Sequence, residues 1–169
     1  MNNNICLVYG GASGEHEVSC ISAQFIQKTI TQSGKTVIPV YIDRNGNWFL
    51  QNNVSHGSVA STDVAEENRC HLIKGKPASL KLQNREIPVD FVFPIIHGTT
   101  GEDGKLQGLL EFLDIPYAGA GVLSSAICMD KYYSKMIFHV NHIPQVKFYK
   151  IDKTDWQGSP DGILQKVAG

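Results

Sequence analysis

One pattern occurs twice in this sequence and constrains its fold more than any other: a short apolar run, a glycine-rich loop, and then apolar residues at helical spacing. The first copy runs from residues 5–9 through the loop GGASGEHE to a segment that ends at Gly34. The second runs from residues 91–96 through HGTTGEDG to leucines on one helical face, at positions 106, 109, 110 and 113. Because strand–helix–strand units place their strands side by side and parallel, the pattern predicts an α/β fold with an open, mainly parallel sheet flanked by helices.

Other strands are predicted between and after these two copies. Residues 36–42 are apolar and rich in β-branched side chains, which predicts a second parallel strand. The turn signal Asn45-Gly46 then predicts a hairpin into a strand over 48–50. A weaker strand pair is predicted near 72–74 and 80–82, as a decoration of the sheet edge.

The later part of the chain carries further signals. Residues 91–96 are almost continuously apolar, which predicts a strand buried on both faces. Residues 115–118 predict a short fourth strand that ends at the glycines of GAG. The spacing of apolar residues beyond it predicts helices over 122–128 and 133–140, a strand over 147–151 and a helix over 163–167.

Composition narrows the class of protein. A chain of 169 residues with 42% hydrophobic and 18% charged residues is typical of a globular fold, not of a disordered one. The net charge of -1 gives no general attraction to nucleic acid or to an anionic membrane. The first apolar run is too short for a signal-peptide core or a membrane span, so we expect a cytoplasmic protein. Four scattered cysteines predict free thiols and no zinc site.

Three loops follow predicted strands at the edge of the sheet where ligands gather in open α/β folds. They cover residues 10–17, 97–104 and 119–121, and they lead into helix N-termini with unpaired backbone N–H groups. The first loop superficially suits a dinucleotide. Its glycine spacing is not G-x-G-x-x-G, and Glu15 would place a carboxylate where a pyrophosphate should lie.

Two interpretations of Glu15 stay open at this point. A carboxylate in the first turn, on Glu15 or Glu17, can simply complement the helix dipole. Alternatively Glu15, flanked by Ser13 and backbone N–H groups, offers a binding site for an ammonium group beside donors for a carboxylate, an arrangement that suits an amino acid zwitterion.

His97 stands at the exit of a predicted strand, where neighbouring glycines let the backbone approach a ligand closely. A single histidine in such a place has either a structural role or a role in substrate contact, and its nearness to the Glu15 loop favours contact. For the two acids that follow, we expect Asp103 to cap the next helix and Glu102 to orient neighbouring loop groups.

The two motif blocks together resemble the amino-terminal part of the D-alanine–D-alanine ligases. They are GGASGEHEVS and HGTTGEDGKLQGLLEFLDIPYAGAGVLSSAICMDKYYSK, and the resemblance covers the chain apart from about residues 51–88. It implies a Rossmann-like pre-ATP-grasp substrate domain over 1–122 and the start of an ATP-grasp central domain over 123–169. It also implies a reaction in which ATP converts the carboxylate of one D-alanine to an acyl phosphate, which the amine of the second attacks to give a dipeptide for peptidoglycan.

The resemblance also implies roles for single residues. By motif position, Glu15 and His97 are the catalytic pair, and both also bind the first D-alanine. Val18 and Ser19 line the same substrate pocket, Ser13 and Glu102 support it, and Lys131 binds the phosphates of ATP. ATP and Mg²⁺ are the cofactors of the full-length family enzyme.

Full-length family members continue beyond the point where this sequence stops. All three arginines, Arg44, Arg69 and Arg85, lie far from Lys131 in the sequence, and after Asp130 the acids are Asp152, Asp155 and Asp161. We therefore expect metal ligands beyond Gly169 and no turnover by this chain alone.

Two other functions stay open beside that of a D-alanine–D-alanine ligase. One is a D-alanine–D-lactate-type ligase, because most of the second-substrate pocket lies beyond this sequence. The other is a non-catalytic module that binds an amino acid or dimerises. The expected partners are D-alanine and, in a possible homodimer, a second copy of the chain.

Overall fold

The computed structural model describes residues 4–54 and 64–168. It divides into two compact units, the first ending at Met129 and the second beginning at Asp130. Within the described residues, no helix combines the length and the apolar character needed to cross a membrane.

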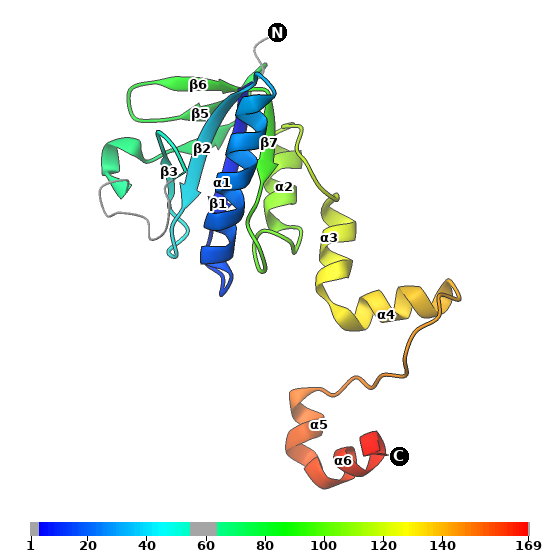
Figure 1. Cartoon of the computed structure of the whole chain (residues 1–169). Coiled ribbons are helices and arrows are strands. Elements are labelled where there is room, and N and C mark those ends of the chain that lie inside the picture. Colours follow the sequence, from blue (N-terminus) through cyan, green and yellow to red (C-terminus); the bar gives the residue numbers. More distant parts are fainter. Residues whose placement is uncertain (1–3, 55–63, 169) are drawn as a thin grey trace. The chain divides into compact units, whose positions relative to one another are not determined.

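A four-stranded sheet forms the centre of the first unit (Figure 1). Its strands are β1 (Asn4–Gly10), β2 (Thr36–Ile42), β3 (Trp48–Leu50) and β7 (Phe91–Pro94), in the order β3-β2-β1-β7. β1 pairs in parallel with both β2 and β7, and β3 pairs antiparallel with β2. The predicted open, mainly parallel sheet is confirmed, with the hairpin at its edge.

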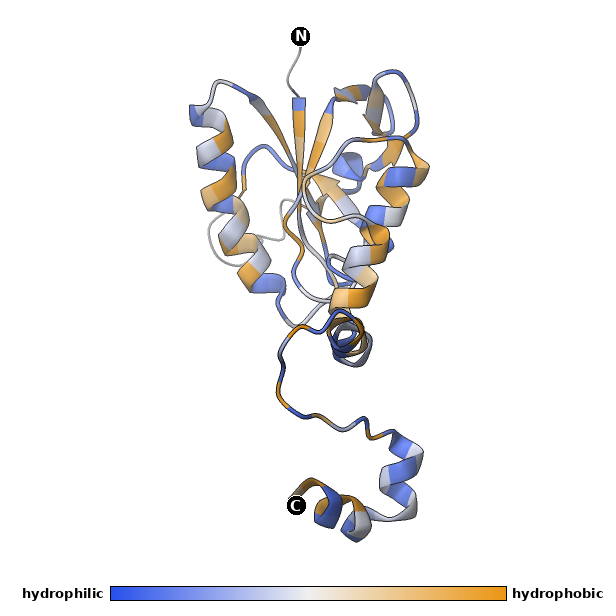
Figure 2. Cartoon of the chain, turned by 90° about the vertical axis from the view of Figure 1, so that its right-hand side faces the viewer, coloured by the Kyte–Doolittle hydropathy of each residue, from blue (hydrophilic) through white to orange (hydrophobic). Residues whose placement is uncertain are grey.

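Helices cover both faces of this sheet, α1 (His16–Gln32) on one side and α2 (Lys105–Phe112) on the other (Figure 2). Side chains alternate along β1, so Leu7 and Tyr9 join the apolar cluster beneath α1, whereas Cys6 and Val8 join the cluster beneath α2. Leu106 and Leu110 on α2, and Leu113 at its C-cap, face inward as predicted, while Leu109 is 40% exposed. The first unit thus has three layers and a core on each side of the sheet.

A second sheet packs against the α2 side of the core. It consists of β4 (His71–Ile73), β5 (Ala78–Lys81) and β6 (Glu86–Val89), all antiparallel, and follows the short 3₁₀ helix η2 (Glu66–Asn68). The expectation that this region only decorates the sheet edge is wrong. Alternate residues of β5 and its continuation, Ala78, Leu80 and Leu82, are buried in the main core, because one face of the small sheet is apolar. β6 was not predicted.

Two strand predictions on the β7 side need correction. β7 is an edge strand in which Val92 is buried in the cluster beneath α2, whereas Phe93 is only partly buried where it packs against the cluster beneath α1, so the predicted burial on both faces is incomplete. The predicted strand over 115–118 is reduced to a single parallel bridge between Tyr117 and Val92, fixed by two backbone hydrogen bonds. Isolated apolar character could not distinguish a strand from a chain that touches the sheet once.

The later helices are α3 (Val122–Met129), which groups with the first unit, and α4 (Lys131–Val140), α5 (Lys153–Gly158) and α6 (Pro160–Ala168) in the second. Asp130 caps α4 by accepting hydrogen bonds from Tyr132 N and Tyr133 N at 2.9 and 3.2 Å. The strand predicted over 147–151 is absent, and α5 was not predicted. A strand needs a neighbour for its backbone groups, and the described part of the second unit contains none.

Candidate functional site

The loops after β1 and β7 lie side by side and are joined by the hydroxyl of Ser13. This hydroxyl donates a hydrogen bond to the backbone carbonyl of His97 at 2.8 Å and accepts one from the backbone N–H of Glu15 at 3.2 Å. Ser13 is 9% exposed, so the link is shielded from water. One side chain therefore fixes the backbones of both predicted site residues relative to each other.

A second serine, Ser19, joins the end of β1 to the residue that follows β7, in the interior beneath the loops. The Ser19 hydroxyl accepts a hydrogen bond from Gly10 N at 2.8 Å and donates one to the carbonyl of Ile95 at 2.6 Å. Ser19 has no exposed surface. In this structure its side chain fastens the ends of β1 and β7.

Glu15 precedes the first residue of α1 and is exposed, and its carboxylate makes no hydrogen bond that caps the helix. Instead it lies against the second loop: a Cβ atom added to Gly98 would be 3.1 Å from Glu15 Oε2. Glu17, in the first turn of α1, is the acid already paired with a cation. Its hydrogen bond with Arg44 lowers the pKa of its carboxyl group. The Glu15 carboxylate is thus available at the rim of the site.

The His97 side chain is 30% exposed and lies between two polar neighbours. Its Nε2 is 3.3 Å from the Ser22 hydroxyl, and its Nδ1 is 3.6 Å from Glu102 Oε1. The other carboxylate oxygen of Glu102 accepts a hydrogen bond from Gly98 N at 3.0 Å. Glu102 therefore lies where it can orient both the imidazole and the loop, the arrangement expected from the sequence.

The remaining predicted residues lie in different surroundings. Val18 lies on the first turn of α1, three residues after Glu15, and is 52% exposed. The N-cap of α2 is Gly104 and not Asp103, but the Asp103 carboxylate accepts hydrogen bonds from the N–H groups of Thr100 and of Lys105, the first residue of that helix. Lys131 belongs to the second unit, where it is exposed as the first residue of α4.

Sequence reasoning missed three side chains that hold the site. Ser22 touches His97, and its only signal was its position one helical turn after Ser19. Arg44 donates to the carbonyl of Ser13 at 3.2 Å from the turn after β2, a contact with no signal in the sequence. His16 is buried beneath the loop, although its position in a polar motif indicated exposure.

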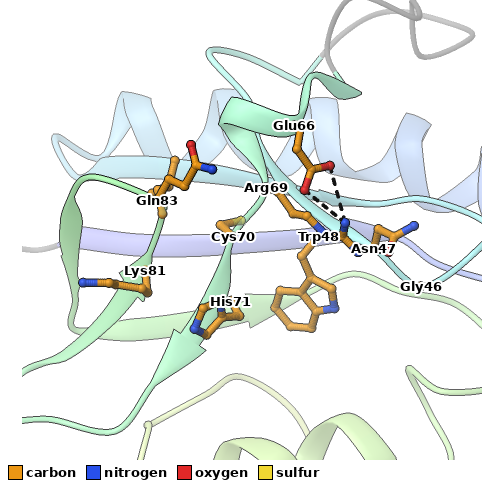
Figure 3. Close-up of a pocket in the computed structure, with 10 residues that line it drawn as sticks. Gly46, Asn47, Trp48, Glu66, Arg69, Cys70, His71, Lys81 and Gln83 are labelled. Atoms are coloured by element: carbon orange, nitrogen blue, oxygen red, sulfur yellow. Dashed lines mark hydrogen bonds and ion pairs between the residues drawn. The ribbon is translucent and has the colours of Figure 1, made fainter.

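Two hollows of the first unit are lined by neither Glu15 nor His97. One of about 500 Å³ lies where β3, β4 and β5 meet, and in it Arg69 reaches Glu66 at 3.1 Å and Asn47 at 2.7 Å (Figure 3). The other, of about 230 Å³, is apolar and lies behind the two loops, against Gly11 and Ile96. The exposed polar groups that suit a zwitterion therefore gather at neither hollow but on the rim between the loops.

Residues 4–120, which contain both loops, match the family model described as D-ala D-ala ligase N-terminus. The chain belongs to this ligase family.

Solved structures of ligases agree with the family match. The D-alanine–D-alanine ligase from Coxiella burnetii is 35% identical, with a TM-score of 0.82 over 97% of this chain and 48% of its own. The ligase from Aeromonas hydrophila is 26% identical, with a TM-score of 0.76 over 99% of this chain and 58% of its own. The VanG D-Ala:D-Ser ligase from Enterococcus faecalis is 29% identical, with a TM-score of 0.75 over 99% and 50%. The chain thus spans about half the length of the ligases it resembles.

Proposed function

We propose that this chain carries the binding site for the first D-alanine of an ATP-dependent D-alanine–D-alanine ligase that serves peptidoglycan synthesis. The observation that supports this most is the Ser13 bridge, which holds the Glu15 and His97 loops together at one rim. A zwitterion needs an anion for its ammonium group and donors for its carboxylate. The Glu15 carboxylate, lying against Gly98, supplies the first, and the imidazole of His97 supplies a donor for the second.

In this proposal the residues divide into contact and support. Glu15 binds the ammonium group of D-alanine, His97 orients the carboxylate that ATP phosphorylates, and Val18 offers apolar contact. Ser13 and Glu102 fix the loop and the imidazole, and Ser19 acts as a positioning residue because its hydroxyl is used by Gly10 and Ile95. Holding the carboxylate in one orientation lowers the entropic part of the barrier to phosphoryl transfer.

The phosphoryl step needs a cation near the phosphates of ATP, and we propose Lys131 for that role, as a compact point charge at the start of α4. We further propose that 1–122 form the substrate domain and that the ATP-grasp central domain begins at 123, with α3. Within residues 4–54 and 64–168 no group of three or more acidic, histidine or cysteine side chains is placed to hold a metal ion. The described residues do not fit a Mg²⁺ site, so no step here is assigned to the metal.

The test of the substrate site is a titration with D-alanine, followed by backbone amide chemical shifts and by calorimetry. We expect weak binding, in the millimolar range, with shifts confined to the loops 10–17 and 97–104. Glu15→Gln should weaken binding about tenfold, since it removes the charge that pairs with the ammonium group. Glu17→Gln is the matched control, because it removes a carboxylate from the same helix end that Arg44 already neutralises.

The outcomes separate the candidate functions. Shifts in both loops that Glu15→Gln abolishes support the proposed site. Equal binding of L-alanine and D-alanine, or shifts elsewhere only, would overturn it. Micromolar binding without nucleotide would instead favour a non-catalytic amino-acid-binding module. The VanG relative is a D-Ala:D-Ser ligase, so the proposal commits to D-alanine as first substrate and leaves the second to the rest of the enzyme.

We also propose that the 169-residue chain does not turn over by itself, because it spans about half the length of the related ligases. An ADP-release assay with D-alanine and Mg·ATP should give no signal above background. Turnover of about 1 s⁻¹ or more, within the usual range of enzymes, would refute this. We also propose a homodimer, which sedimentation of the same sample tests.

We propose the cytoplasm as the place of action, because the reaction requires ATP.

A further inference from the structure

A buried pair of side chains, His16 and Tyr41, lies directly beneath the loop that carries Glu15. Both residues are 5% exposed. His16 Nδ1 is 2.7 Å from the carbonyl oxygen of Gly11, and His16 Nε2 is 3.0 Å from the Tyr41 hydroxyl. The two rings meet edge to face, with centroids 5.5 Å apart. The imidazole therefore connects the start of the loop to β2.

The glycines at the start of the loop are fitted to the same tyrosine. A Cβ atom on Gly10 would lie 3.0 Å from the Tyr41 ring and 2.3 Å from the carbonyl oxygen of Ile42. Gly11 N donates a hydrogen bond to that carbonyl at 2.8 Å. Tyr41 thus supports the loop through its ring at Gly10 and through its hydroxyl at His16.

The protons in this chain of contacts can be assigned from the partners. The Gly11 carbonyl can only accept, so His16 Nδ1 carries the proton of that bond. In the neutral imidazole Nε2 then accepts, and the Tyr41 hydroxyl donates to it. Burial raises the pKa of Tyr41 to about 12, which keeps this hydroxyl protonated as a donor.

We infer that His16 and Tyr41 are positioning residues for Glu15: the Tyr41 hydroxyl fixes the orientation of the His16 ring, and His16 fixes the loop through Gly11. His16 follows Glu15 directly, so a change in the direction of the imidazole also moves the carboxylate. The inference deepens the proposed function and rests on it for the role of Glu15. The ordering of the loop by the two buried side chains is measurable without any substrate.

The first test is Tyr41→Phe in the whole chain, with Tyr117→Phe as the matched control. Each variant removes one hydroxyl. The Tyr117 hydroxyl donates a hydrogen bond to Glu111 at 2.8 Å, and this contact is not part of the Glu15 loop. We expect Tyr41→Phe to raise hydrogen exchange of the Ser13–Glu15 amides about fivefold, as expected for one lost hydrogen bond. The Nε2 resonance in the ¹⁵N spectrum of His16 should shift, because Nε2 loses its hydrogen-bond donor, while Nδ1 keeps its proton against the Gly11 carbonyl. Tyr117→Phe should change neither.

A second pair of variants covers the case in which Tyr41→Phe loosens the whole core. His16→Asn keeps an N–H donor near the place of Nδ1, whereas His16→Leu removes both bonds of the imidazole. We expect His16→Asn to retain most of the protection of the loop amides from hydrogen exchange, and His16→Leu to lower that protection about tenfold. Exchange of the Leu7 and Val8 amides measures global unfolding in both variants. Equal losses in both variants would overturn the inference.

D-Alanine binding adds the functional readout. Tyr41→Phe should weaken D-alanine about threefold to fivefold, while Tyr117→Phe leaves it unchanged. Unaltered loop exchange and an unaltered His16 Nε2 resonance in Tyr41→Phe would refute the inference whatever the substrate does. If wild-type chain shows no shift with D-alanine while Tyr41→Phe still loosens the loop, the proposed function fails and the positioning of the loop by His16 and Tyr41 stands.

Discussion

Both units of this chain contain helices, but the units differ in how they are held together. The first unit buries side chains on both faces of its sheet, among them Leu7, Val8, Leu80 and Leu110 at 0% exposure. In the second, no described residue from 130 to 168 is buried, and Met136, Trp156 and Leu164 are 38%, 46% and 56% exposed. Local signals such as the Asp130 cap suffice to define a helix, but stability in water comes mainly from the burial of an apolar face.

Hydrogen exchange gives the largest expected contrast between the units. The β1 amides should exchange at least about 10³-fold more slowly than unprotected amides, since they open only with global unfolding. Amides of α4 to α6 should exchange within about tenfold of unprotected rates, because few tertiary contacts hold those helices. Protection of the second unit equal to that of β1 would break the comparison.

Thiol labelling sharpens the comparison inside the first unit. The structure has four free cysteines, of which Cys128 on α3 is exposed and three are buried. Burial raises the pKa of Cys20 to about 11 and of Cys70 to about 12, so at pH 8 only about one in a thousand or fewer is a thiolate. Iodoacetamide at pH 8 should modify Cys128 more than about 100-fold faster than the others. In urea all four should react alike, and fast labelling of Cys70 in the native chain would show that its core is open.

Two matched leucine-to-alanine substitutions measure the difference in stability between the two units as a free energy of unfolding. Leu110→Ala should lower the free energy of unfolding in urea by about 3 kcal/mol, because it leaves a cavity beneath α2. Leu164→Ala should lower it by less than about 0.5 kcal/mol, because that side chain is 56% exposed on α6. A similar loss for both would mean that the second unit contributes to the cooperative fold.

The smallest expected effect concerns two glycines of the first unit with left-handed backbones. Gly98 has φ +73° and Gly34 has φ +77°, so alanine at either should cost about 1 kcal/mol in unfolding free energy. At Gly34 the new Cβ would meet nothing within 4 Å, whereas at Gly98 it would press on Glu15 Oε2. Gly98→Ala alone should therefore shift the Glu15 amide resonance. An unchanged Glu15 signal would show that the carboxylate does not lie against Gly98.

The sequence predicted best those elements whose signal lies within a few neighbouring residues. The second parallel strand was predicted as 36–42 and observed at Thr36–Ile42, because β-branched character and flanking turns define it locally. The strand predicted over 147–151 failed because pairing depends on a partner that the sequence does not reveal. Sequence similarly indicated apolar residues in 72–82 without showing that they close one side of the main core.

The candidate site divides in the same way. Glu15, His97 and Glu102 were chosen from loop position and motif, and the structure brings their loops together. Which side chains lie beneath them was not predictable, because a buried contact such as His16 with Tyr41 joins residues 25 positions apart. Ser19 shows the converse: its motif position indicated the site, but only the three-dimensional packing shows that its hydroxyl is enclosed.

The close packing of Gly10 at the end of β1 against the end of β2 also limits which sequences can adopt this fold. The volume that a methyl group would need is already filled by the Ile42 carbonyl, 2.3 Å away. In a saturation library scored for soluble expression, position 10 should tolerate glycine alone, whereas open Gly14, with nothing within 4 Å of an added Cβ, should accept many residues. A designer who grafts this loop onto another scaffold must therefore transplant the end of the neighbouring strand together with it.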